Sequence, residues 1–178
     1  MKIRLAADLQ PDSIVDGIGI RTVLWTQGCP HHCKGCHNPI THSFDDGFLV
    51  DVEDIKQQVK KLKNQKGLTF SGGDPMCQAK QCAEIAKYAK SLGMDIWCYT
   101  GYTFEQLLSM NNKDILEFLN YIDILVDGKF VLEEKSYNLK FKGSKNQRII
   151  DVSRSLIEDK IVLLEEEKEP TKKEYIFI

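Results

Sequence analysis

The sequence predicts an α/β fold, an incomplete (β/α) barrel built around a mostly parallel sheet. Short β-rich runs alternate along the chain with longer stretches in which apolar residues recur at helical spacing. This alternation is typical of parallel strands joined by crossover helices. The chain has 178 residues, whereas a complete eight-unit barrel typically needs about 250 residues. We therefore expect a single domain over residues 1–178, in which the barrel has one open side.

The first part of the chain contains two predicted strands with one helix between them. A β-rich run at residues 22–27 leads directly into a glycine and a cysteine cluster, so we expect a strand that ends in a loop. Residues 51–64 place four apolar side chains at helical spacing, with Asp51 as the expected N-cap. A second strand is predicted at residues 68–70.

The same pattern then repeats. A helix is expected at residues 79–92 and a third strand at residues 95–99. Thr103 and Gln106 form a capping-box pattern in front of the next helical stretch, and residues 122–126 predict a fourth strand. Two shorter runs fit further strands, at residues 148–152 and 161–164.

Two polar segments have no predicted function. Residues 133–146 are irregular and are interpreted as a solvated loop, and residues 165–178 are interpreted as a charged C-terminal tail. The core of the domain is expected at about residues 10–152.

Composition and charge limit which partners we expect the protein to bind and in which compartment we expect it to act. The hydrophobic fraction of 42% and the charged fraction of 28% are those of a soluble globular protein, and the net charge of -2 offers no basic surface for nucleic acid. We find no apolar run of membrane-spanning length and no export signal, so we expect a cytoplasmic protein without a membrane partner. In that reducing compartment, the six cysteines are expected to serve chemistry rather than disulfides.

The strongest chemical signal is a group of three cysteines, Cys29, Cys33 and Cys36, with the spacing C-x3-C-x2-C. Thiolates are the usual ligands of iron–sulfur clusters, and a 4Fe-4S cube normally takes four of them. Three ligands leave one iron free to bind a small molecule through its amino and carboxylate groups. The sequence therefore predicts a catalytic cluster rather than an electron carrier.

A structural zinc site is the alternative interpretation of the same loop. A nearby histidine would then supply the fourth ligand: His31, His32 or His37. The C-x3-C-x2-C spacing differs from the paired C-x2-C elements of zinc ribbons, which disfavours this alternative. The other three cysteines are interpreted as small buried hydrophobic residues: Cys77, Cys82 and Cys98.

Further polar or glycine-rich segments follow the other predicted strands. Gly72 and Gly73 follow the second strand, where a bare backbone can approach a ligand and its carbonyls can accept from an ammonium group, and Asp74 adds a carboxylate. Thr100 follows the third strand and Asp127 ends the fourth. Each segment alone also fits a simple turn. Because the carboxyl ends of the strands in a β/α barrel share one face, we expect these segments at one site.

Together these motifs resemble the radical SAM superfamily, in which a 4Fe-4S cluster cleaves S-adenosylmethionine (SAM). Within it, the chain is similar to the activating proteins of anaerobic ribonucleoside-triphosphate reductases in DGIGIRT (16–22), GCPHHCKGCHNP (28–39), SGGDP (71–75), YTGY (99–102), DILVDGKF (123–130) and GSKNQRIIDV (143–152). The resemblance implies an incomplete barrel of the radical SAM type. It also implies a single cluster, since no second cysteine group lies between Cys36 and Gly72.

The resemblance implies an activity as well. A reduced cluster passes one electron to SAM, which splits into methionine and a 5′-deoxyadenosyl radical, and this radical abstracts hydrogen from a glycine Cα in the partner. The implied cofactors are one 4Fe-4S cluster and SAM. The implied partners are the large subunit of anaerobic ribonucleoside-triphosphate reductase and an electron donor such as flavodoxin or ferredoxin. The alternatives are a pyruvate formate-lyase activase, a 7-carboxy-7-deazaguanine synthase and, outside the superfamily, a zinc-stabilised binding module.

The resemblance also assigns residues to roles. The cluster ligands, which are also the catalytic residues, are Cys29, Cys33 and Cys36. The residues expected beside SAM are Gly35, Cys36 and His37, those at its methionine end are Gly72, Gly73 and Asp74, and further candidates are Thr100 and Asp127. Arg21, at the first strand, would either hold an anionic group or lie in a salt bridge.

Overall fold

A mixed sheet forms the centre of the protein, and the computed structural model describes residues 1–164. The described strands are β1 (Lys2–Leu5), β2 (Gln10–Ser13), β3 (Arg21–Thr26), β4 (Phe48–Asp51), β5 (Gly67–Gly72), β6 (Asp95–Tyr99), β7 (Ile124–Asp127) and β8 (Arg148–Asp151). They lie in the order β4-β1-β3-β5-β6-β7-β8, and β2 pairs with β3 off this path. The strands β3, β5, β6 and β7 are parallel, and the pairings of the outer strands are antiparallel.

The parallel centre lies where the sequence predicts strands, and the edges differ from the prediction. β8 is antiparallel to β7, because the chain between them carries no α-helix that would cross over the sheet and returns to the same end. Residues 161–164 contribute one isolated bridge, between Ile150 and Leu163, rather than a strand. The described strands therefore form an open path that is parallel at its centre and antiparallel at its edges.

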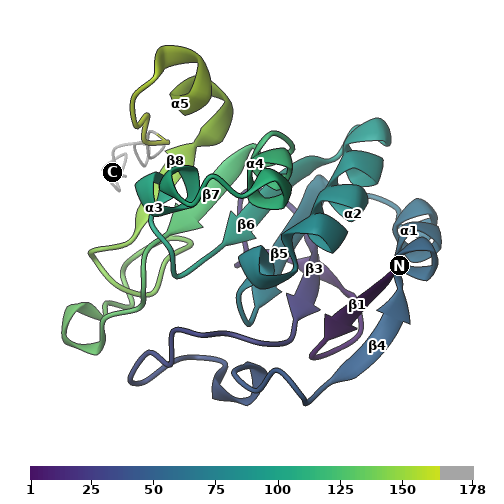
Figure 1. Cartoon of the computed structure of the whole chain (residues 1–178), viewed down its shortest axis with the longest axis horizontal. Coiled ribbons are helices and arrows are strands. Elements are labelled where there is room, and N and C mark those ends of the chain that lie inside the picture. Colours follow the sequence, from purple (N-terminus) through teal and green to yellow (C-terminus); the bar gives the residue numbers. More distant parts are fainter. Residues whose placement is uncertain (165–178) are drawn as a thin grey trace, which may run out of the picture.

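Helices cover one face of this sheet (Figure 1). The described helices are α1 (Val52–Lys61), α2 (Ala79–Ser91), α3 (Phe104–Ser109), α4 (Lys113–Leu119) and α5 (Val152–Glu158), with 3₁₀ turns η1 (Pro39–Thr41), η2 (Pro75–Gln78) and η3 (Leu132–Glu134). α2 packs between α1 and α4 and contacts β1, β5 and β6. The three helices thus form one layer over the centre of the sheet.

Of the two predicted helix starts with named capping residues, one is capped as expected. The capping box of Thr103 and Gln106 is confirmed at the start of α3. Gly93 follows α2 with a φ of 83°, a left-handed conformation that ends helices readily in glycine. Asp51 occupies the N-cap position of α1, but its side chain makes no capping hydrogen bond.

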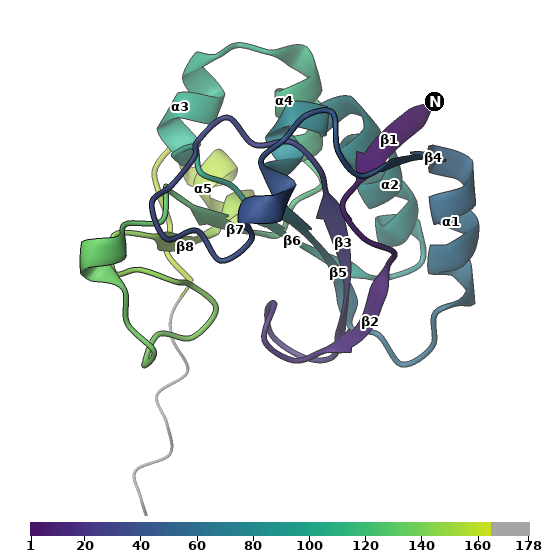
Figure 2. The ribbon, with the colours of Figure 1, turned by 90° about the horizontal axis from the view of Figure 1, so that it is seen from below.

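Side chains of the parallel strands alternate between the face of the sheet that the helices cover and the opposite face. Leu24 and Phe70 point to the helix-covered face and belong to the main hydrophobic core. Val23, Thr69 and Trp97 lie in register on the opposite face, across β3, β5 and β6. Among the described residues, no α-helix covers this opposite face (Figure 2). The predicted site residues lie at the carboxyl ends of the parallel strands.

Arg21 is fully buried at the start of β3 on the face opposite to the helices. Its guanidinium donates to Thr69 Oγ1 at 2.8 Å and to the carbonyls of Ile18 and Leu68, and it forms an ion pair with Asp95. Burial lowers the pKa of Arg21, and the negative charge of Asp95 opposes this effect. Of the two roles considered from the sequence, the structure shows the salt bridge.

The predicted charged tail at residues 165–178 lies outside the described residues. Within the described part of the chain, none of the helices is long and apolar enough to cross a membrane.

Candidate active site

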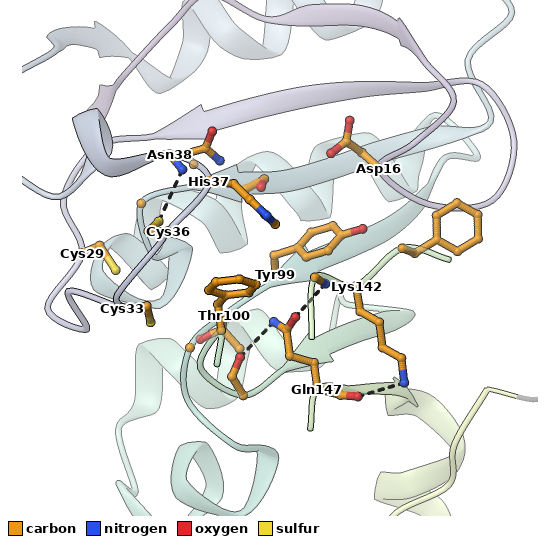
Figure 3. Close-up of a pocket in the computed structure, with 18 of the residues that line it drawn as sticks. Asp16, Cys29, Cys33, Cys36, His37, Asn38, Tyr99, Thr100, Lys142 and Gln147 are labelled. Carbon is orange, nitrogen blue, oxygen red and sulfur yellow. Dashed lines mark hydrogen bonds between the residues drawn. The ribbon is translucent and has the colours of Figure 1, made fainter. Parts of the chain in front are cut away.

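A cavity of about 740 Å³ opens at the carboxyl ends of the parallel strands. The loops that follow β3, β5, β6 and β7 all contribute to its lining, as is usual for ligand sites of parallel α/β sheets. In Figure 3 the three labelled cysteines lie together at one side of the cavity, and Gln147 and Lys142 lie at the other. The predicted segments therefore meet at one place.

The cysteine loop begins where β3 ends. Gly28 has a φ of 100°, which turns the chain out of the strand. The N–H groups of Gly28 and Cys29 donate to the carbonyls of Thr41 and His42, so the loop closes on itself. Within it, three half-buried thiols line the cavity: Cys29, Cys33 and Cys36.

The donor set of this loop fits a 4Fe-4S cluster. Three thiols on one short loop are the soft ligands that iron–sulfur clusters take. The backbone N–H of Asn38 donates to Cys36 Sγ at 3.3 Å, a type of bond that tunes the thiolates of such clusters. Within residues 1–164, no three His, Cys, Asp or Glu side chains are placed to hold a single metal ion. A cube does not require such a placement, because each thiolate binds a different iron.

The surroundings of Cys29 favour the protonated thiol. Burial raises the pKa of Cys29 to about 11, and the negative charge of Asp74 contributes in the same direction, whereas a backbone hydrogen bond involving His31 lowers it. Binding of a cluster at Cys29 therefore requires loss of the thiol proton.

The other three cysteines do not line the cavity. Cys82 and Cys98 are fully buried in the main core, as the sequence predicts. Cys77 is exposed, so the prediction of a buried residue is wrong at this position. It lies in the 3₁₀ turn η2 ahead of α2, and the buried side chains of this turn are those of its neighbours Pro75 and Met76.

Gly72 and Gly73 line the cavity, and the structure gives a packing reason for both glycines. Gly72 has a φ of 99°, and a Cβ there would lie 2.5 Å from the carbonyl oxygen of Thr26. A Cβ on Gly73 would lie 2.4 Å from the carbonyl oxygen of Gly28. Both glycines thus allow the loop after β5 to lie directly against the start of the cysteine loop.

The carboxylate of Asp74 is engaged inside the protein. The residue is 1% exposed and does not belong to the cavity lining. Its oxygens accept from Met76 N, Gly101 N and Thr100 Oγ1, each at 3.0 Å, and a further hydrogen bond of 2.7 Å joins it to His31. Asp74 therefore joins three loops behind the wall of the cavity.

Of three further candidates, two line the cavity and one does not. Thr100 is buried and lines the cavity. His37 is exposed, lines the cavity and has its ring 4.9 Å from that of Phe130. Gly35 does not belong to the lining; it has a φ of 73°, and a Cβ there would lie 2.9 Å from the side chain of Leu132.

Asp127, the last candidate, ends β7 and is 1% exposed, outside the cavity lining. Its carboxylate accepts from Phe104 N at 2.8 Å, at the start of α3, and from the guanidinium of Arg148. Arg148 also forms a two-bond ion pair with Glu105. The structure thus brings Asp127 to a salt-bridge network between α3, β7 and β8, next to the site.

Part of the predicted solvated loop at residues 133–146 forms the far wall of the cavity instead. The wall residues lie between β7 and β8: Leu139, Lys140, Phe141, Lys142 and Gly143. Gln147 holds this wall, since its Oε1 accepts from Gly143 N at 2.8 Å and its Nε2 donates to the carbonyl of Gly128 at 3.0 Å. The segment has no hydrophobic period that would have predicted a wall. The one signal in the sequence was the similarity of the adjoining GSKNQRIIDV (143–152) to the activating proteins.

Tyr99, at the end of β6, also lines the cavity, although no role was predicted for it from the sequence. Burial raises the pKa of this tyrosine, and the negative charge of Asp16 contributes in the same direction. Both effects disfavour loss of the hydroxyl proton of Tyr99.

Comparisons with known proteins agree with this geometry. The family model described as a 4Fe-4S single cluster domain matches residues 15–150. An anaerobic ribonucleoside-triphosphate reductase-activating protein of Vibrio cholerae is 38% identical over 147 residues, which cover 78% of this chain and 92% of that protein. The protein of the same name from Haemophilus influenzae is 37% identical over 147 residues, with the same coverage. That from Escherichia coli is 34% identical over 152 residues, which cover 77% and 92%.

Among solved structures, the fold is similar to that of QueE from Escherichia coli. The TM-score is 0.50 at 14% sequence identity, and the match covers 58% of this chain and 54% of QueE. The chain thus matches about half the length of QueE, and the similarity concerns the fold.

Proposed function

Because the chain belongs to the family of anaerobic ribonucleoside-triphosphate reductase-activating proteins, we propose that it generates a glycyl radical on the large subunit of such a reductase. When bound, the reduced 4Fe-4S cluster supplies one electron that splits SAM into methionine and a 5′-deoxyadenosyl radical, which takes hydrogen from a glycine Cα. One observation carries the proposal: the cysteine loop shares a single cavity with the loops after β5, β6 and β7.

The proposed cluster ligands are Cys29, Cys33 and Cys36. Their position on one cavity wall supports this assignment, as does the hydrogen bond from Asn38 N–H to Cys36 Sγ. Three protein ligands leave one iron for the amino and carboxylate groups of SAM. The proposed neighbours of SAM on this loop are Gly35, Cys36 and His37.

The methionine end of SAM is proposed to meet the backbone of Gly72 and Gly73, next to Thr100. All three residues line the cavity, which supports direct contact. Asp74 and Asp127 are proposed to act indirectly, from behind the cavity wall. Their carboxylates already accept hydrogen bonds from the protein, so they hold the loops in place.

The proposal also covers the fold around the site and the way in which the reductase reaches it. We propose one radical SAM domain whose open sheet is an incomplete barrel, and the fold shared with QueE supports this. An open side would let a peptide of the reductase reach the cavity.

We further propose that the protein acts in the cytoplasm with flavodoxin or ferredoxin as electron donor. The net charge of -2 supports the absence of a nucleic-acid partner, and no membrane partner is proposed.

The decisive test combines the reconstituted protein, SAM and a reductant with anaerobic ribonucleoside-triphosphate reductase. Electron paramagnetic resonance should show a doublet, because the one hydrogen left on the glycine Cα couples to the unpaired electron. Replacing the target glycine of the reductase by alanine should abolish this signal, as should Cys33→Ala in the activating protein.

Two results would contradict the proposal in different ways. SAM cleavage without a radical on a competent reductase, combined with activation of another glycyl-radical enzyme, would exclude the partner and leave the chemistry. Stoichiometric zinc without acid-labile sulfide after anaerobic purification would exclude the cluster itself.

A further inference from the structure

His31 is the one residue between Cys29 and Cys33 that reaches across to the loops after β5 and β6. Its Nε2 lies 2.7 Å from Asp74 Oδ2, and the two side chains are 5% and 1% exposed. Because a carboxylate only accepts hydrogen bonds, the Nε2–H of His31 is the donor. A buried hydrogen bond thus connects the cysteine loop to the carboxylate that joins its neighbours.

The segment after β6 is shaped around the His31 ring. A Cβ on Gly101 would lie 2.3 Å from His31 Cδ2, so only glycine leaves room for the ring. Tyr102 packs on the ring edge to face, with the ring centroids 4.5 Å apart. The N–H of Gly101 and the hydroxyl of Thr100 donate to the same Asp74 carboxylate. The YTGY segment therefore forms a socket for His31.

The adjacent histidine has no such role. His32 is exposed, and its ring meets that of His42 within the cysteine loop itself, 5.2 Å away. Its φ of 47° lies in the left-handed region, which asparagine also tolerates. His32 is therefore a matched control for His31, one residue away on the same loop.

Building on the proposed function, we propose that His31 is a positioning residue. By donating to Asp74 and fitting the socket of Gly101 and Tyr102, it holds the Cys29–Cys33 turn at a defined angle to the Gly72-Gly73 segment. That angle decides whether SAM can reach the open iron and the backbone after β5 at the same time. The protein is thus expected to bind a cluster without His31, but to bind SAM poorly.

The test compares three variants of the reconstituted protein. In His31→Asn the side chain is too short for its amide to reach Asp74. In His31→Gln the amide nitrogen can lie near the position of the histidine Nε2. His32→Asn is the control. Each should bind one cluster, as measured by iron and acid-labile sulfide. His31→Asn should weaken SAM binding about tenfold, the lower end of the 10–100-fold loss that removing an orienting hydrogen-bond partner costs at related sites. It should also remove the change that SAM causes in the resonance spectrum of the reduced cluster.

The two other variants decide the interpretation. His31→Gln should restore most of the SAM affinity and the spectral change, and His32→Asn should match the unmodified protein. Equal SAM affinity in His31→Asn and the unmodified protein would overturn the inference, as would a His31→Gln variant as impaired as His31→Asn. If the unmodified protein neither binds nor cleaves SAM, the proposed function fails instead.

A variant outside the cysteine loop covers the case in which His31→Asn takes up no cluster. Tyr102→Leu removes only the ring that packs against His31. It should bind the cluster and weaken SAM binding. Unchanged SAM affinity in this variant would contradict the role of the socket.

Discussion

Gly73 lies so close to Gly28 that a Cβ at position 73 would come within 2.4 Å of the Gly28 carbonyl oxygen. The same carbonyl accepts a hydrogen bond of 2.8 Å from Asp74 N. The clash would involve backbone atoms, which cannot turn aside as a flexible side chain can. The loop after β5 and the start of the cysteine loop are therefore held together by direct backbone contact.

We expect Gly73→Ala to destabilise the protein by about 1–3 kcal/mol, the usual cost of inserting a methyl group where there is no room. Because the clash pushes the two loops apart, it should also reduce cluster uptake. Denaturant unfolding and iron content measure the two effects. Gly93→Ala is the control: its Cβ would meet no atom within 4 Å, and its positive φ should cost about 1 kcal/mol without affecting the cluster. A Gly73→Ala variant with unchanged stability and iron content would refute the contact.

The cysteines should fall into two groups when replaced by alanine. The variants expected to lose the 4Fe-4S absorbance are Cys29→Ala, Cys33→Ala and Cys36→Ala. Cys77→Ala should retain it, because this thiol is exposed and lies outside the cavity lining. Cys82→Ala and Cys98→Ala should also retain it, with a modest loss of stability from the small cavities they leave in the core. Loss of the cluster in Cys77→Ala alone would show that a ligand was wrongly assigned.

Glu105 should give the protein a pH-dependent part of its stability. Its hydrogen bonds with Arg148 lower the pKa of Glu105 from 4.5 to about 2. A carboxylate with a lowered pKa stabilises the fold fully above the unfolded value, and this contribution is lost as the pH falls through the folded value. The stability difference between the unmodified protein and Glu105→Gln should therefore shrink from pH 5 toward pH 2. Since the side chain is 57% exposed, the difference should not exceed about 1 kcal/mol.

Thermal unfolding at several pH values measures this difference. Glu117→Gln, on the exposed side of α4, is the control for a general loss of one negative charge. A difference that stays constant between pH 5 and pH 2 would show that the ion pair with Arg148 does not form in solution.

Arg148→Met should destabilise the protein by about 3 kcal/mol or more, because it leaves the carboxylate of Asp127 buried without its cation. The double variant Arg148→Met with Asp127→Asn should recover part of this loss, since the uncompensated charge is then gone. Urea unfolding measures both.

Asp127→Asn alone separates two possible roles of this residue. If Asp127 acts only by holding α3 against β7, the variant loses stability and binds SAM normally under conditions in which it is fully folded. Weaker SAM binding by the folded variant would instead indicate direct contact between Asp127 and SAM.

Local pattern was sufficient for the centre of this protein. The four parallel strands, the helix layer and the capping box of Thr103 and Gln106 follow from hydrophobic periodicity and capping chemistry, which act over a few residues. The spacing of three cysteines favoured a 4Fe-4S cluster, because a short loop brings its own thiols together, and the resemblance to the radical SAM superfamily added SAM as the second cofactor.

Contacts between distant residues decided the rest. The side chain of Asp74 could face a ligand or the protein, and its partners His31 and Thr100, 43 and 26 residues away, decide that it faces the protein. The wall at residues 139–143 has no hydrophobic period of its own, because it is held by single long-range contacts: Gly143 N donates to Gln147, and the ring of Phe141 packs against Trp97. Which strand lies at an edge, and which carboxylate faces a cavity, depends on where the chain returns in space. A local stretch of sequence does not reveal this, because buried polar groups find their hydrogen-bond partners across the entire fold and not among their neighbours along the chain.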